Sequence, residues 1–262
     1  MEATIDIDRM IEICFAAQFV VYGYMALFLY PYNDYDTIPR MRHTGSKSYL
    51  RGRRVLAVVY IFLGIAAGFG LCPASPSNGS AAGGWASPLV PACLTLFFMA
   101  HTGLLLGLCD STATGRKNYL LHLLPLPVLC VFYAVFPAWG AAVAVLQSVH
   151  LVALIGWYTP LFYKEYDNLN CCCWDAVNET SDDVASDYDC LPESMPWIGR
   201  RYIGLLVITL LALLAHFLPY GWTAYVMAVL FTGYLFWFFY WVFLRFPRFA
   251  RALFYYMNEE WG

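Results

Sequence analysis

Seven long apolar runs, separated by shorter polar segments, dominate the pattern of the chain. Within each run the apolar residues are continuous, and the runs approach the roughly 18 to 25 residues that an α-helix needs to cross a bilayer. Inside lipid the backbone must satisfy its own hydrogen bonds, and continuous apolar runs achieve this as helices. We therefore predict an all-α integral membrane bundle of seven transmembrane helices, at about residues 9–31, 54–72, 88–109, 119–136, 139–162, 201–218 and 223–245.

The composition is that of a membrane protein rather than a soluble globular domain. Of the 262 residues, 61% are hydrophobic and 18% aromatic, whereas only 13% are charged. The segment before the first run, MEATIDIDR, is acidic at the place where a secretory signal peptide would be positively charged. No cleavable signal peptide is therefore expected.

Lysine and arginine are distributed unequally between the two sets of connecting segments. All but Arg9 of the fifteen basic residues follow the first, third, fifth and seventh runs, and the opposite connections carry no charge. Loops rich in Lys and Arg remain in the cytoplasm, and acidic residues contribute little to orientation. The pattern predicts a multi-pass protein of the cell inner membrane, with its N-terminus outside and its C-terminus in the cytoplasm. The basic residues on the predicted cytoplasmic side are Arg40, Arg42, Lys47, Arg51, Arg53, Arg54, Arg116, Lys117, Lys164, Arg200, Arg201, Arg245, Arg248 and Arg251.

An acidic stretch, SDDVASDYD from Ser181 to Asp189, lies within a predicted cytoplasmic loop at residues 164–200. The first cytoplasmic segment, RMRHTGSKSYLRGRR, carries the opposite charge on the same face. Opposite patches of this kind can dock, and a docked pair is an element that a signal can bias. A solvated acidic loop without a partner is the alternative. The residues expected to form the docking contact are Asp182, Asp183, Asp187, Asp189, Arg51, Arg53 and Arg54.

Polar residues inside the predicted spans are the candidates for a ligand site, because such residues are costly in lipid. Gln147 and His150 are three residues apart, so they share one helix face near the middle of the bilayer. Together with Gln18 and Tyr22 of the first span, they are expected to line a small polar pocket. The alternative is that each side chain makes one interhelical hydrogen bond that stabilises the bundle.

Motifs for catalysis or for metal binding are lacking in the sequence. No HxxxH or HExxH occurs, and His101, His122, His150 and His216 fall at different predicted depths. The chain also has no GxSxG, no glycine-rich phosphate loop and no paired carboxylates within a span. We therefore expect neither an enzyme nor a bound cofactor or metal.

The region around the fifth and sixth spans resembles a known family. The residues Tyr158, Tyr163 and Tyr166, the polar stretch with Ser181-Asp182-Asp183, the segment Trp197-Ile198-Gly199-Arg200-Arg201 and the tail FYYMNEEWG carry the resemblance. They are similar to the membrane part of Bacteroidetes regulators that combine a multi-span N-terminal domain with a C-terminal AraC-type helix-turn-helix domain. Residues 158–201 and 253–262 are covered.

That resemblance implies a membrane domain at residues 1–252 and, at 253–262, the start of a cytoplasmic linker to an output domain outside this sequence. DNA would be bound only through that absent domain, and a homodimer is possible for this organisation. The implied function is a membrane sensor that passes a small-molecule or membrane-derived signal to transcription.

Two other functions are compatible with the sequence. One is a small-molecule transporter with its site near Gln147 and His150, in which Pro125 and Pro127 would unwind the fourth span. The other is a passive membrane anchor for the output domain.

Overall fold

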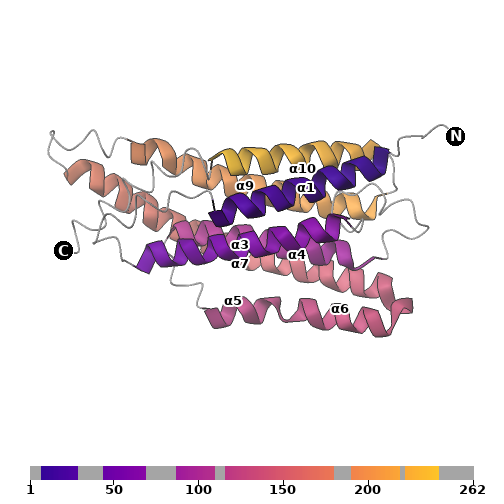
Figure 1. Cartoon of the computed structure of the whole chain (residues 1–262). Helices are drawn as coiled ribbons and strands as arrows, with labels where there is room; N and C mark the ends of the chain where they lie inside the picture. Colours follow the sequence, from indigo (N-terminus) through magenta and orange to yellow (C-terminus); the bar gives the residue numbers. More distant parts are fainter. Residues whose placement is uncertain are drawn as a thin grey trace.

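The computed structural model describes residues 7–28, 44–68, 87–109, 116–179, 190–218 and 222–241, and these parts are helical and contain no strand (Figure 1). Helices overlap all seven predicted spans, with the fourth divided into two, so the prediction of an all-α bundle is confirmed, whereas the number of membrane crossings stays a prediction. The helices are α1 (Ile7–Phe28), α3 (Thr44–Gly68), α4 (Leu89–Leu108), α5 (Arg116–Leu123), α6 (Pro125–Val135), the short 3₁₀ helix η3 (Pro137–Trp139), α7 (Gly140–Glu179), α9 (Cys190–Phe217) and α10 (Trp222–Tyr240).

Two helices are longer than the apolar runs that predicted them. Helix α7 continues from the end of the predicted fifth span at residue 162 to Glu179, and α9 begins at Cys190 rather than near residue 201. Within the predicted cytoplasmic segment 164–200, for which the sequence predicts a short helix plus loop, residues 164–179 and 190–200 are helical and continue α7 and α9. The bundle extends on one side through these two helices (Figure 1).

Four helices in the described residues are long and apolar enough to cross a membrane: the segments Met10–Leu27, Leu89–Leu108, Pro137–Cys171 and Pro196–Phe217. Two further apolar segments, Leu121–Val135 and Tyr225–Tyr240, are shorter. Helix α3 starts with a polar, basic part, so less of its described length is apolar. These features identify a membrane protein.

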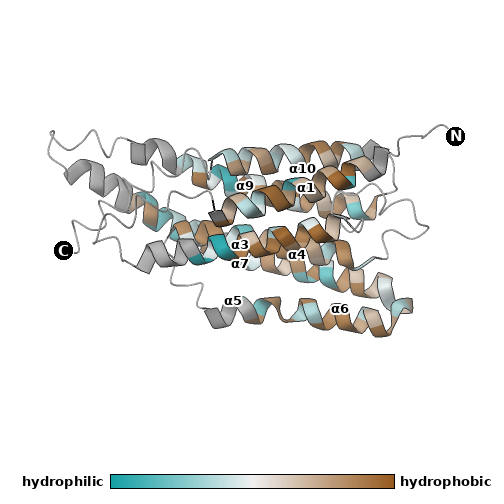
Figure 2. Cartoon of the chain, viewed as in Figure 1, coloured by the Kyte–Doolittle hydropathy of each residue, from teal (hydrophilic) through white to brown (hydrophobic). Residues whose placement is uncertain are grey.

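The outward surface of the bundle is apolar, as expected of helices that face lipid. Large side chains such as Val58, Val131, Val149, Val229 and Phe236 are each more than half exposed. Figure 2 shows hydrophobic residues along the length of the central helices, with hydrophilic ones concentrated toward one end. A soluble monomer rarely exposes so much contiguous apolar surface.

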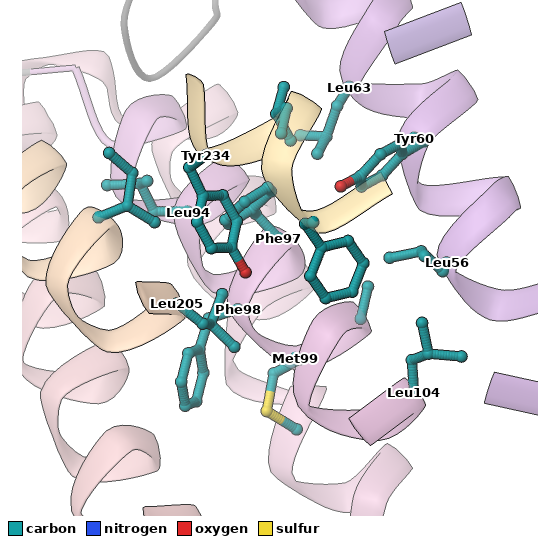
Figure 3. Close-up of a cluster of buried hydrophobic side chains, with 14 of the residues drawn as sticks. Leu56, Tyr60, Leu63, Leu94, Phe97, Phe98, Met99, Leu104, Leu205 and Tyr234 are labelled. Carbon is teal, nitrogen blue, oxygen red and sulfur yellow. The ribbon is translucent and has the colours of Figure 1, made fainter. Parts of the chain in front are cut away.

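Helix α4 forms the centre of the bundle. Almost all of its residues from Val90 to Leu108 are buried, and α3, α7 and α9 pack around it. A helix that is apolar on all sides is normally buried on all sides. The core around α4 contains Leu94, Phe97, Phe98 and Met99, which Figure 3 shows together with Tyr60 of α3, Leu205 of α9 and Tyr234 of α10.

Small residues allow α1 and α3 to approach closely. A Cβ atom at Gly64 would lie 2.8 Å from Cγ2 of Val20 and 3.1 Å from the carbonyl oxygen of Ala16. Close helix packing through glycine is a common means of helix association in lipid, where apolar side chains alone provide little driving force.

Several sequence-based expectations lie outside the described residues. They include the acidic stretch with Asp182, Asp183, Asp187 and Asp189, and the segment 253–262 that resembles a linker.

Candidate functional site

Gln147 lies in the seam between α7 and α6. Its side chain is buried, and Nε2 donates to Sγ of Cys130 on α6 at 3.6 Å. The side-chain carbonyl oxygen of Gln147 is buried and has no hydrogen-bond partner within the described residues. A buried acceptor without a donor is unfavourable, so this oxygen is available to a donor group on a ligand.

His150 and Tyr158 connect α7 to α5 through a single residue, His122. Nε2 of His150 lies 3.0 Å from the carbonyl oxygen of His122, and Nδ1 of His122 lies 2.9 Å from the Tyr158 hydroxyl. Because a carbonyl oxygen only accepts, Nε2 of His150 is the donor. We call Gln147, His150, Tyr158, His122 and Cys130 the α7 seam.

The His122 carbonyl is available because the helix breaks next to it. Helix α5 ends at Leu123 and α6 begins at Pro125, with Leu124 in a turn between them. Pro125 and Pro127 have no backbone N–H, so they cannot donate to the carbonyls of the preceding turn. Leu124 itself keeps helical dihedral angles (φ −57°, ψ −38°), so the helix is interrupted over one residue and is not unwound, and the interruption lies beside the His122 carbonyl that accepts from His150.

Helices α5 and α6 pack against the other helices on one side only. Within α6 no residue is fully buried, and its main helical neighbour is α7. Figure 1 shows α5 and α6 at the edge of the bundle, away from α1 and α10. The α7 seam is therefore the boundary between a peripheral helix pair and the central helices.

The other two predicted pocket residues lie on the opposite flank. Gln18 donates from Nε2 to the hydroxyl of Tyr22 at 3.3 Å, one turn along α1. The Tyr22 ring stacks on Phe239 of α10, with 4.2 Å between the ring centroids. The structure thus brings Gln18 to Tyr22, and it places Gln147 and His150 together against α5–α6, but the two pairs have different neighbours.

The arginines expected to dock the acidic stretch differ in exposure. Arg51 and Arg54 are exposed. Arg53 is buried, and its guanidinium donates from Nε to the carbonyl of Ala26 at 2.6 Å and from Nη2 to that of Leu27 at 3.4 Å. Those carbonyls end α1, where a helix favours a cation. Arg53 therefore has a structural role that the sequence does not indicate.

His101 occupies an aromatic shell in the core. Nδ1 lies 2.9 Å from the carbonyl of Phe97, and Nε2 lies 2.7 Å from the hydroxyl of Tyr60. The rings of Phe97 and Phe238 lie 4.2 and 4.5 Å from the imidazole centroid. In the neutral ring, Nδ1 donates to Phe97 and Nε2 accepts from Tyr60, so both nitrogens are satisfied.

Arg201 of α9 is a buried cation that sequence reasoning placed at the cytoplasmic surface. Its side chain is 1% exposed, and Cζ lies 3.3 Å from the ring centroid of Trp237 on α10. Trp197 and Trp241 lie further away, at 5.3 and 5.8 Å. The tryptophans could have indicated this position, since Arg stacks favourably on indole, but the pairing across helices is not visible in the sequence.

Among the described residues, no group of three or more His, Cys, Asp or Glu side chains could hold a metal ion. Comparison of the chain with protein-family models, curated proteins and solved structures finds no match.

Proposed function

We propose that this chain is the sensor domain of a membrane receptor and that it passes a small-molecule or membrane-derived signal to a cytoplasmic, transcription-regulating output. One observation carries the proposal. Helix α7 is continuous over 40 residues and so is about 60 Å long, roughly twice the hydrocarbon thickness of a bilayer. A single rod thus joins the polar seam at Gln147 and His150 to a surface outside the lipid.

The α7 seam supplies the sensing end. A ligand that bonds to the free oxygen of Gln147, or that replaces the Nε2–carbonyl contact of His150, would separate α5–α6 from α7. Because α6 has no buried residue, a movement of α6 would leave the core in place, whereas α5 stays joined to α4 through the Tyr119 hydroxyl, which donates to the Met99 carbonyl. The two arrangements of α5–α6 form a two-state element that a ligand can bias.

Pro160 lies on α7 between the seam and the extension toward Glu179. Proline removes one helical hydrogen bond and is the usual cause of a helix bend. The missing bond is the one to the Gly156 carbonyl, while the hydroxyl of Thr159 donates to the neighbouring Ile155 carbonyl at 2.7 Å, a type of back-bond that also favours bending. A change at the seam would therefore alter the direction of the α7 extension at Pro160.

The topology predicted from the distribution of Lys and Arg gives the same direction of signalling. With the N-terminus outside, the extensions of α7 and α9 would project into the cytoplasm on the same side as the acidic stretch and the basic first part of α3. Docking of Asp182, Asp183, Asp187 and Asp189 onto Arg51 and Arg54 would then provide a contact that the extension of α7 can regulate. A homodimer is compatible with this organisation.

A transporter is the second candidate, and the α5–α6 break favours it. Broken helices near polar groups provide substrate sites in many transporters. Here His150 donates to the carbonyl of His122, two residues before the turn at Leu124.

The test uses the complete natural reading frame in its host. Transcript levels are measured for wild type, for a deletion, and for Gln147→Leu combined with His150→Leu. Val149→Leu combined with Val152→Leu is the matched control, because these side chains are half or more exposed on the same helix. We expect the Gln147/His150 variant to alter the same transcripts as the deletion, and the control to match wild type.

The other outcomes separate the alternatives. Unchanged transcripts in the deletion strain, together with loss of uptake of a solute, would replace the sensor with a transporter. If the deletion alters transcripts but the Gln147/His150 variant does not, the chain is an anchor or its sensing site lies elsewhere.

A further inference from the structure

The cation at Arg201 has no counter-ion in the part of the chain that the structure describes. Its Nε and Nη1 atoms are buried and make no hydrogen bond. The flat face of the guanidinium is covered by Trp237 at 3.3 Å, which leaves its edge with unused donors. A buried charge is unfavourable unless an opposite charge and hydrogen bonds compensate it.

A second unpartnered donor lies close to the first. The hydroxyl of Tyr234 is buried and has no hydrogen-bond partner among the described residues, and it lies within electrostatic reach of Arg201. Gly204, one turn from Arg201 on α9, makes room for this arrangement. A Cβ at Gly204 would lie 2.7 Å from Cζ3 of Trp237 and 3.3 Å from Cε2 of Tyr234.

The surroundings of Arg201 match the headgroup level of a bilayer. Trp197, Trp237 and Trp241 surround the guanidinium, and tryptophan is enriched where hydrocarbon meets headgroups. Arg201 lies near the start of the apolar segment Pro196–Phe217. Phosphate is the most abundant oxyanion at this depth, and the guanidinium fork fits its oxygens in pairs.

We propose that Arg201, Tyr234 and Trp237 form a binding site for a phosphate-type oxyanion, which reaches the site as a phospholipid headgroup or as free phosphate. Arg201 neutralises and orients the oxyanion, the Tyr234 hydroxyl donates a further hydrogen bond, and Trp237 holds the guanidinium plane in position. Lipid headgroups are bound by basic pockets of this kind between transmembrane helices. The leaflet depends on the proposed topology, whereas binding itself does not.

Native mass spectrometry of the whole purified chain tests the site. Phosphatidylglycerol, phosphatidylcholine and inorganic phosphate are titrated separately, and the bound fraction is measured. The variants are Arg201→Gln and, as the matched control, Arg200→Gln, which removes the same charge from an exposed neighbour. Loss of a charge-assisted, paired contact should weaken phosphatidylglycerol binding by roughly tenfold or more in Arg201→Gln, with less than about a twofold change in Arg200→Gln.

Comparing the binding of phosphatidylglycerol with that of inorganic phosphate distinguishes the source of the oxyanion. Binding of phosphatidylglycerol in preference to inorganic phosphate assigns the site to a lipid headgroup, whereas Arg201-dependent binding of inorganic phosphate at similar concentrations assigns it to free phosphate. Equal loss in both arginine variants would show a general effect of surface charge and would overturn the proposal. Undiminished binding in Arg201→Gln would overturn it as well.

Tyr234→Phe tests the oxyanion site if Arg201→Gln fails to fold. This change removes only a hydroxyl that no described residue hydrogen-bonds, so the thermal unfolding temperature should be unchanged or higher. Binding of the oxyanion should nevertheless weaken by roughly threefold to tenfold, because one donor is lost. Unchanged binding in Tyr234→Phe would overturn the site.

Discussion

The hydroxyl of Tyr60 lies 2.7 Å from Nε2 of His101 and joins α3 to α4 inside the aromatic core. Both side chains are fully buried, and the imidazole has a second contact with the carbonyl of Phe97 at 2.9 Å. The hydrogen bond is thus a polar link between α3 and α4 within a mainly aromatic and aliphatic core.

Tyr60→Phe removes this link while retaining the ring. Nε2 of His101 would then be buried without a partner, so we expect the free energy of unfolding to fall by about 1 to 2 kcal/mol. The measurement is unfolding in a denaturing detergent, with Tyr240→Phe as the control because Tyr240 is 45% exposed. Equal stability of Tyr60→Phe and wild type would show that the hydrogen bond contributes nothing.

Gly64→Ala should separate α1 from α3. The added methyl group would lie 2.8 Å from Val20, so we expect a loss of roughly 1 to 3 kcal/mol in the free energy of unfolding. Gly156→Ala is the control on α7, where a Cβ meets nothing within 4 Å. There alanine should be neutral or stabilising by about 0.5 to 1 kcal/mol, because it favours helix more than glycine does. The same loss in both variants would contradict close packing at Gly64.

Arg53→Gln should destabilise the end of α1. The variant loses the contacts with the carbonyls of Ala26 and Leu27, and we expect a cost of about 1 to 3 kcal/mol in the free energy of unfolding. Arg54→Gln removes the same charge from an exposed position and should change stability by less than about 0.5 kcal/mol. If the two variants are equally stable, the guanidinium of Arg53 is not a cap of α1.

Single cysteines report on the proposed orientation. In a chain whose native cysteines are replaced by alanine, Ser80→Cys should react with an impermeant thiol reagent on intact cells, and Ser186→Cys only after lysis. Both positions are outside the described residues, and the expectation rests on the distribution of Lys and Arg. Reaction of both from outside would refute the topology.

Charge exchange tests the proposed docking of the acidic stretch. Changing its four aspartates to asparagine should alter basal output, and reversing the charges on both segments should partly restore it. Exposed pairs contribute less than about 1 kcal/mol each, so only several pairs together can bias an equilibrium. Arg53 is omitted from the exchange because it is buried. No change in output after neutralisation would leave the stretch as a solvated loop.

The positions of the helices could be predicted because the length of an apolar run is limited by the thickness of the bilayer. The extensions of α7 to Glu179 and of α9 from Cys190 could not be predicted in this way, because residues outside lipid form helices without being apolar. The break at Leu124 was visible in advance, since Pro125 and Pro127 lack the backbone donors that a continuous helix requires.

The contacts within the candidate site were much less predictable. In a membrane protein, the faces toward lipid and toward the core are both apolar, so periodicity does not show which helices meet. Gln147 and His150 were identified as a pair by their spacing, but the assignment of Gln18 and Tyr22 to their pocket required knowledge of the neighbours of α1. Arg201 was counted with the surface charges because its burial depends on Trp237 of another helix.

The central position of α4 has a consequence for biogenesis. Two of the helices that enclose it, α7 and α9, are synthesised after it. The polar atoms of His101 are satisfied by Tyr60 of the preceding helix and by Phe97 of α4 itself, so α1, α3 and α4 can form a stable group in lipid before the later helices emerge. The helices can therefore insert in the order of translation, and each new helix packs against helices that are already stable in the bilayer.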